Sequence, residues 1–255
     1  MLWYKSWLDT RSRFLVGLVL LVLSACGTVF YYPQVLKLMP MASTIEASGD
    51  LGRRIREGVA LASNYRGYIW SQWMRQAMTN LATLFAVLLG SGGLFSRASG
   101  DSALFTLSLP ASRTRVLGVR AATGLAQLLA LAVIPALFLP LLSPGVGQSY
   151  SPTDALVHGV CLFVAAATFF SLALLLSTVF TDLWRPLLIA CGVAIALSLY
   201  EAALRGQSTY GIFRVMSGED YFRTGRLPWL GLFSSVTASA AMLFTATRTL
   251  ARQDF

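Results

Sequence analysis

Few side chains of this chain could carry out chemistry, and their spacing forms no catalytic constellation. The sequence has a single histidine, His158, which cannot supply an HExxH motif or a three-histidine metal site. The two lysines, Lys5 and Lys37, do not follow the glycines of a phosphate-binding loop. We therefore expect no enzymatic activity, no ATP site, no cofactor and no metal in this chain.

The remaining reactive side chains lie inside apolar runs. Cys26, Cys161 and Cys191 lack CxxC spacing and are expected to pack as small hydrophobic residues. His158 follows the start of an apolar run by about one turn. A packing role is the favoured interpretation of this histidine, and a proton relay is the alternative. Because the runs contain almost no ionisable groups, a transporter driven by an ion gradient is not expected.

The composition is that of an integral membrane protein. Hydrophobic residues make up 56% of the 255 residues and charged residues 12%, whereas soluble domains are roughly 25% charged. The net charge of +9 fits arginines that face the cytoplasm and anionic lipid. Nucleic acid is not an expected partner, because no basic cluster is combined with stacking aromatic residues. We predict one all-α transmembrane domain, residues 1–255.

Six apolar runs are each long enough, at roughly 20 residues, to cross a bilayer. Between the first two runs, residues 33–75 form a long outer loop that could bind an outer-face partner or lie on the membrane as a helical hairpin. Before the last run, residues 206–226 are too apolar for a solvated loop and predict a polar, re-entrant-like helical pair. The six predicted transmembrane helices are residues 14–32, 76–95, 121–142, 155–180, 187–204 and 229–247.

Residues 1–13 predict an N-terminal amphipathic interfacial helix with Trp3 and Trp7 at the membrane surface. Six spans put both termini on one side, and basic residues close to span ends favour the cytoplasmic side. A competing interpretation is a lipoprotein signal that ends at Cys26. The apolar run continues past Cys26 to Tyr32, which favours a membrane anchor.

The segment between the second and third spans has the pattern of a docking element. Asp101 and Ser102 are suitable N-cap residues, an apolar stretch follows, and Pro110 ends it. This describes a short helix at the membrane surface. Its surroundings are strongly basic, with Arg97, Arg113, Arg115 and Arg120.

Two stretches here resemble a known family. Residues 89–94 read LGSGGL and residues 103–113 read ALFTLSLPASR. Together they are similar to the signature of type 2 ATP-binding-cassette (ABC) transporter permeases, the membrane subunits of bacterial exporters. Members often carry a glutamate after the glycine-rich stretch, whereas the nearest acid here is Asp101.

The resemblance implies a permease in the bacterial inner (cytoplasmic) membrane. A separate ABC ATPase subunit would hold ATP and magnesium, and a second copy or a related permease would complete the path. A cytoplasmic coupling helix between spans 2 and 3 would dock on the ATPase. An alternative function is a non-transporting membrane anchor that recruits an ATPase or enzyme. The expected coupling residues are Leu104, Phe105 and Leu107 as groove contacts, Arg97, Asp101 and Arg113 as polar contacts, and Pro110 at the helix end.

Overall fold

The computed structural model describes residues 2–43, 49–91, 113–180, 182, 184–204 and 211–252. Within these residues all regular structure is helical. In this described part of the chain, five helices are long and apolar enough to cross a membrane, which indicates a multi-pass membrane protein. They are α1 (Leu2–Ser43), α6 (Arg113–Leu142), α7 (Pro152–Val179), α8 (Trp184–Ala203) and α11 (Trp229–Arg252).

A further continuous helical segment consists of α3 (Tyr65–Tyr68), the π-helix η1 (Ile69–Met78) and α4 (Thr79–Gly90). We call it helix 65–90. The predicted second span, residues 76–95, falls on η1 and α4 up to Gly90, and residues 92–95 lie outside the described residues. Helical structure therefore begins well before the predicted start of this span.

The N-terminal segment differs from its prediction. Residues 2–13 are the first part of α1 rather than a separate interfacial helix. The reason is local: residues 2–16 contain no glycine or proline that would interrupt helical hydrogen bonding. Trp3 and Trp7 are nevertheless exposed, as side chains at a membrane surface would be.

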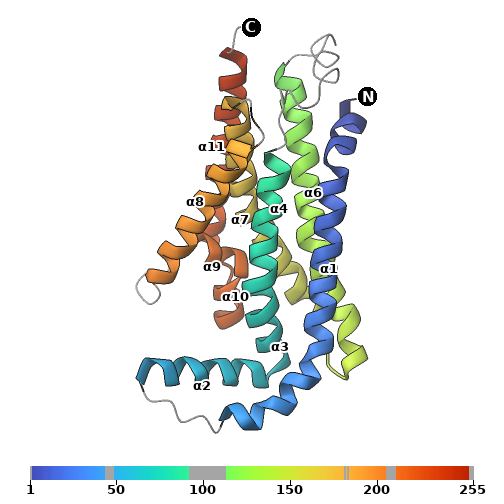
Figure 1. The fold of residues 1–255 in the computed structure, drawn as a ribbon, viewed down its shortest axis with the longest axis vertical. Coiled ribbons are helices and arrows are strands. Elements are labelled where there is room, and N and C mark those ends of the chain that lie inside the picture. Colours follow the sequence, from blue (N-terminus) through green and yellow to red (C-terminus); the bar gives the residue numbers. More distant parts are fainter. Residues whose placement is uncertain are drawn as a thin grey trace.

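The predicted outer loop, residues 33–75, is largely helical. α1 continues through Pro33, and α2 (Gly49–Ser63) then crosses the end of the bundle at a steep angle to the other helices (Figure 1). The aromatic residues before the second span, among them Trp70 and Trp73, are of the kind that forms a belt at the membrane interface. In the structure Trp70 and Trp73 are both 0% exposed, so they pack against protein. Hydropathy alone could not distinguish these two environments for an aromatic side chain.

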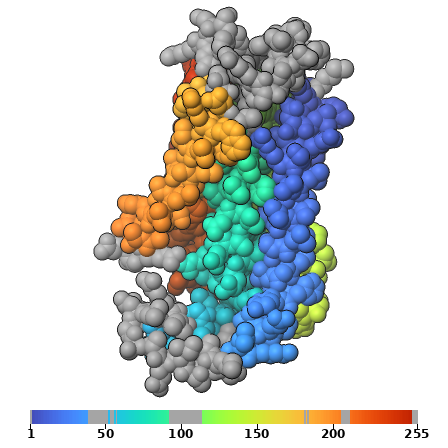
Figure 2. Space-filling view, viewed as in Figure 1, coloured from blue at the N-terminus to red at the C-terminus, as the bar shows by residue number. Residues whose placement is uncertain are grey.

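α7 is the central helix of the bundle. It contacts α4, α6, α8 and α11, and most of its side chains between Ala155 and Thr178 are buried. α8 diverges from the bundle toward the end where α2 lies (Figure 2). Two short helices, α9 (Ile212–Ser217) and α10 (Glu219–Thr224), pack near that end, where the sequence predicted a helical pair.

α1 and helix 65–90 run in opposite directions, side by side, and three hydrogen bonds join them. Arg13 Nη1 donates to the Leu88 carbonyl at 2.7 Å. Trp73 Nε1 donates to the Ser24 hydroxyl at 3.0 Å. The Tyr68 hydroxyl donates to the Thr28 carbonyl at 3.2 Å. The contacts are thus spread along the length of both helices.

The start of α1 and the end of α11 lie at one end of the bundle (Figure 1). The end of α4 and the start of α6 lie at this same end, so the interval 92–112 begins and ends there. α2, α3 and the turn η3 (Ser143–Val146) lie at the opposite end. We call these the terminal end and the α2 end.

Candidate functional site

The predicted coupling residues lie almost entirely outside the described residues. Arg113 is the exception, because its backbone begins α6. The structure does describe the two helices that flank the interval, α4 and α6, and these contact each other directly. The residues outside the description are Arg97, Asp101, Leu104, Phe105, Leu107 and Pro110.

The start of α1 is bonded to both flanking helices. The Leu88 carbonyl that accepts from Arg13 lies in the last turn of α4. A cation in that position interacts favourably with the negative end of the helix dipole. On the other side, Gln127 Nε2 of α6 donates to the Thr10 hydroxyl at 2.8 Å. Displacement of either flanking helix would therefore pull on α1.

A second arginine lies close to this junction. Arg120 of α6 is repelled by Arg13 and attracted by Asp9. Its Nε atom is buried and has no hydrogen-bond partner within the part of the chain that the structure describes. From the sequence alone, Arg13 and Arg120 are expected to be charged side chains at the membrane interface. Nothing in their spacing indicates that α1 and α6 would bring them together.

Asp154 joins three elements at the α2 end. Its Oδ2 pairs with Arg66 Nε at 2.9 Å, and its Oδ1 accepts from the Tyr221 hydroxyl at 2.9 Å. The Asp154 side chain is 15% exposed. It is available for these contacts because Ser151 is the N-cap residue of α7 and accepts from the Asp154 N–H with its hydroxyl. Asp154 therefore connects α7 to helix 65–90 and to α10.

His158 packs beneath the turn between α9 and α10. It is 1% exposed, and its ring lies edge-on to Tyr221 at 5.6 Å between centroids. Gly218 forms the turn at φ 61°, and a Cβ atom there would collide with His158 Nδ1. Neither ring nitrogen makes a well-formed hydrogen bond within the described residues. This geometry fits the packing interpretation of His158.

Aromatic residues hold the short helices against helix 65–90. Trp70 stacks on Phe222 with centroids 4.4 Å apart and planes inclined by 4°. The indole N–H of Trp70 donates to the Ser217 carbonyl at 3.0 Å. Both contacts are long-range, and sequence periodicity carried no signal for them.

Glu201 connects the end of α8 to the same unit. Both of its carboxylate oxygens accept from the Phe213 N–H, at 3.1 and 3.2 Å. The four-residue spacing of Glu201 and Arg205 predicts an ion pair between them, and Arg205 lies outside the described residues. The carboxylate caps the first turn of α9, where free N–H groups favour a negative charge.

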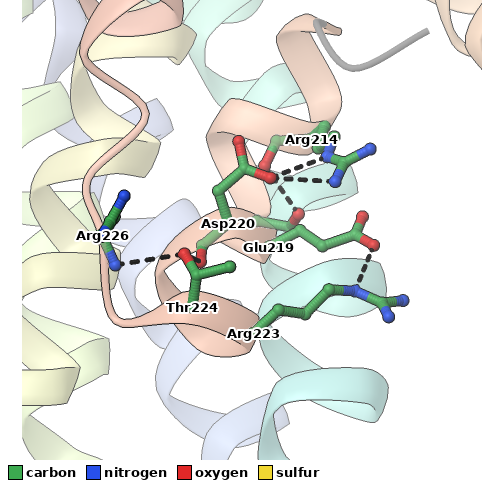
Figure 3. A network of polar contacts seen from close by, with 7 residues as sticks. Arg214, Glu219, Asp220, Arg223, Thr224 and Arg226 are labelled. Atoms are coloured by element: carbon green, nitrogen blue, oxygen red, sulfur yellow. Dashed lines mark hydrogen bonds and ion pairs between the residues drawn. The ribbon is translucent and has the colours of Figure 1, made fainter.

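One ion pair joins the two short helices, and a second lies within α10 (Figure 3). Arg214 of α9 pairs with Asp220 of α10 at 2.9 Å, and Arg223 pairs with Glu219 at 2.8 Å. The Thr224 hydroxyl accepts from the Arg226 N–H at 3.3 Å. α9 and α10 thus form one unit, which is attached to α7, α8 and helix 65–90.

Two tyrosines of this end keep their protons at neutral pH. The hydrogen bond to Asp154, together with burial, raises the pKa of Tyr221. Burial, with the nearby Asp154 charge as a smaller cause, raises the pKa of Tyr150. Tyr221 therefore stays a hydrogen-bond donor to Asp154 across the physiological range.

Comparison with known proteins identified no relative of this chain. No family model, curated protein or solved structure matches the chain.

Proposed function

We propose that the chain is the membrane-spanning permease subunit of a type 2 ABC exporter, driven by a separate ATPase. The observation that carries the proposal is the sequence of residues 89–113, with its glycine-rich stretch and its ALFTLSLPASR segment. An all-helical, multi-pass bundle supports it, as does the return of the chain to one end of the bundle across the interval 92–112.

Helix 65–90 is the proposed sixth span. It would be roughly 39 Å long at the α-helical rise, which exceeds the roughly 30 Å of a hydrocarbon core. It packs against α1 and, through α4, against α6, α7 and α8. Protein contacts on several sides accommodate its polar residues, such as Arg75 and Asn80, in a span that hydropathy marks only weakly.

Six spans would place the terminal end on one side of the membrane, and we propose that this side is the cytoplasm of a bacterial cell. The α2 end, with the α9–α10 unit, would then face outward. The arginines of the terminal end lie in short segments next to apolar helices, as the positive-inside rule requires.

The proposed mechanism is mechanical. Closure of the ATPase on ATP and magnesium would displace a coupling helix that contacts it through Leu104, Phe105 and Leu107. Arg97, Asp101 and Arg113 would supply polar contacts at its edges. The motion would enter α4 and α6 and would reach α1 through Arg13 and Gln127. A second copy, or a related permease, would enclose the path in the lipid bilayer.

The test is Phe105→Asp, with Arg185→Asp as a control between α7 and α8. A tagged chain is purified from its native membrane, and co-purification of an ABC ATPase and its rate of ATP hydrolysis are measured. We expect Phe105→Asp to lose both, because a carboxylate cannot enter an apolar groove without a partner. Unchanged values for both would contradict the proposal.

The alternative function, a membrane anchor that recruits an ATPase or enzyme without transport, gives a different result. It predicts co-purification of the partner but no dependence of ATP hydrolysis on the permease in liposomes. Stimulated hydrolysis in liposomes that contain both subunits would favour the exporter.

A further inference from the structure

A small open pocket lies where α2 meets the start of helix 65–90. Its volume is about 170 Å³, which is enough for a compact polar group with a short apolar extension. The pocket is lined by Ala60, Leu61, Asn64, Arg66, Gly67 and Phe222. Among the residues whose side chains the structure describes, the lining combines hydrogen-bond donors with apolar surface and includes no acidic side chain.

Arg66 is held in place while part of its guanidinium stays available. Its Nε is fixed by Asp154 at 2.9 Å, and its guanidinium carbon lies 5.5 Å from the centre of the Phe222 ring. The side chain is 44% exposed. Its other nitrogens have no hydrogen-bond partner within the described ranges. A positioned guanidinium with free N–H groups matches phosphate and carboxylate oxygens well.

Asn64 supplies a second donor. Its side-chain carbonyl accepts the Arg66 N–H at 3.1 Å, so the amide NH₂ group is the end left for a ligand. The corner between α2 and helix 65–90 depends on Gly67, because a Cβ there would collide with the Leu61 carbonyl. This close approach brings the apolar side chain of Leu61 to the same pocket as Arg66.

We propose that this pocket binds an oxyanion, a phosphate or carboxylate group, carried on an apolar chain. Arg66 and Asn64 donate to the oxyanion, and Leu61 and Phe222 contact the chain. The pocket lies at the α2 end of a membrane-spanning bundle, where lipid headgroups would surround it. The proposal does not depend on the transport function.

The experiment uses the full-length protein in neutral detergent, with bound ligand measured by native mass spectrometry. The probes are dioctanoyl phosphatidylglycerol, dioctanoyl phosphatidylcholine and inorganic phosphate. We expect the anionic lipid to be retained roughly fivefold more than the zwitterionic lipid, as for one arginine near an anionic headgroup. Equal retention of the two lipids, with no phosphate binding, would overturn the proposal.

The informative variant is the double substitution Arg66→Gln with Asp154→Asn. It removes the guanidinium without leaving a buried carboxylate unpaired, and its melting temperature is checked against the wild type. The matched control is Arg75→Gln, because the Arg75 guanidinium lies 5.5 Å from the Trp70 ring centre and does not line the pocket. The double variant should lose the preference for the anionic lipid, and the control should keep it.

If both variants lose the preference equally, the effect is general surface charge and the proposed site is wrong. Competition by millimolar inorganic phosphate would support the site and identify a free oxyanion as a sufficient ligand. Retention of the anionic lipid without such competition would support the site and identify the lipid headgroup, with its chain, as the ligand.

Discussion

α7 and α8 are both apolar enough to cross a membrane, yet they lie in opposite environments. In the apolar stretch of α7, 61% of the residues are buried, against 17% in α8. Their composition does not explain the difference, because both are rich in Leu and Ala. The two helices differ in how closely neighbouring helices approach their backbones.

Glycines make these close approaches to α7 possible. A Cβ atom on Gly90 of α4 would lie 2.5 Å from the Phe170 carbonyl oxygen of α7. A Cβ on Gly159 of α7 would lie 3.1 Å from the Ala132 carbonyl oxygen of α6. A Cβ atom on Gly192 of α8 would meet no atom of another described element within 4 Å. Small residues therefore mark the centre of this bundle, as they do at helix contacts in membranes generally.

The largest effect is expected from Gly90→Val, with Gly192→Val as its counterpart on α8. The first substitution forces a branched side chain against the α7 backbone and should cost about 3 kcal/mol, as in overpacked cores. The second faces open space and should leave the melting temperature nearly unchanged. Thermal unfolding in detergent measures both. Equal losses would remove the distinction between the central and the peripheral helix.

Gly218→Ala tests the outer part of α7. The alanine would carry a positive φ and collide with His158, so we expect a loss of about 2 kcal/mol. The double variant with His158→Ala should recover the part due to the collision but not the part due to the backbone. Additive losses in this double-mutant cycle would mean that the two residues do not contact.

Asp154→Ala and Asp182→Ala compare a carboxylate in the first turn of α7 with one just before α8. Asp154 loses an ion pair and a hydrogen bond at a mostly buried site, for a cost of about 1.5 kcal/mol. Asp182 pairs with Arg185 at 3.2 Å, but both side chains are more than half exposed. Its removal should cost about 0.3 kcal/mol or less.

A second measurement tests whether the loss of Asp154 exposes the buried face of α7 or only lowers the stability of the whole protein. Cys161 is buried on α7, and Cys26 and Cys191 can be replaced by alanine. A thiol reagent should reach Cys161 in Asp154→Ala faster than in Asp182→Ala. Equal labelling rates in the two variants would contradict the inference that Asp154 holds α7 against helix 65–90 and α10.

Apart from the control variants, the smallest effect is expected from Glu201→Gln, at the end of α8. Glutamine keeps one acceptor for the Phe213 N–H but loses the charge at the start of α9, which is worth about 0.5 kcal/mol. Tyr200→Phe is the neighbouring control, because Tyr200 is exposed. A large loss for Glu201→Gln would show that α8 is attached more firmly than its surface contacts indicate.

The sequence predicted the position of each of the five long apolar helices, because span formation depends on the apolarity of each segment alone. It did not predict all of their ends: α1 begins at Leu2 and α6 at Arg113, 12 and 8 residues before the predicted spans. It predicted a helical pair within residues 206–226, where α9 and α10 lie, because that segment is too apolar for a solvated loop. It missed the continuity of α1 past Arg13 and the start of helix 65–90 at Tyr65, where polar residues are accommodated by protein contacts. The coupling role of residues 97–113 stays a prediction.

The contacts made by Asp154 and Glu201 could not be predicted from the sequence. Asp154 meets Arg66 and Tyr221, each separated from it by many residues. Such pairs depend on how helices pack, which local spacing does not encode. The Phe213 N–H that Glu201 accepts from is 12 residues away, at the start of α9.

The hydrogen bonds between α1 and helix 65–90 restrict how these two helices can move. Sliding along their common axis by one turn would break the bonds of Arg13, Ser24 and Thr28 together. Tilting as a pair would preserve all three. A push on the end of α4 would therefore tilt both helices together rather than slide them past each other, and it would reach the α2 end through Tyr68.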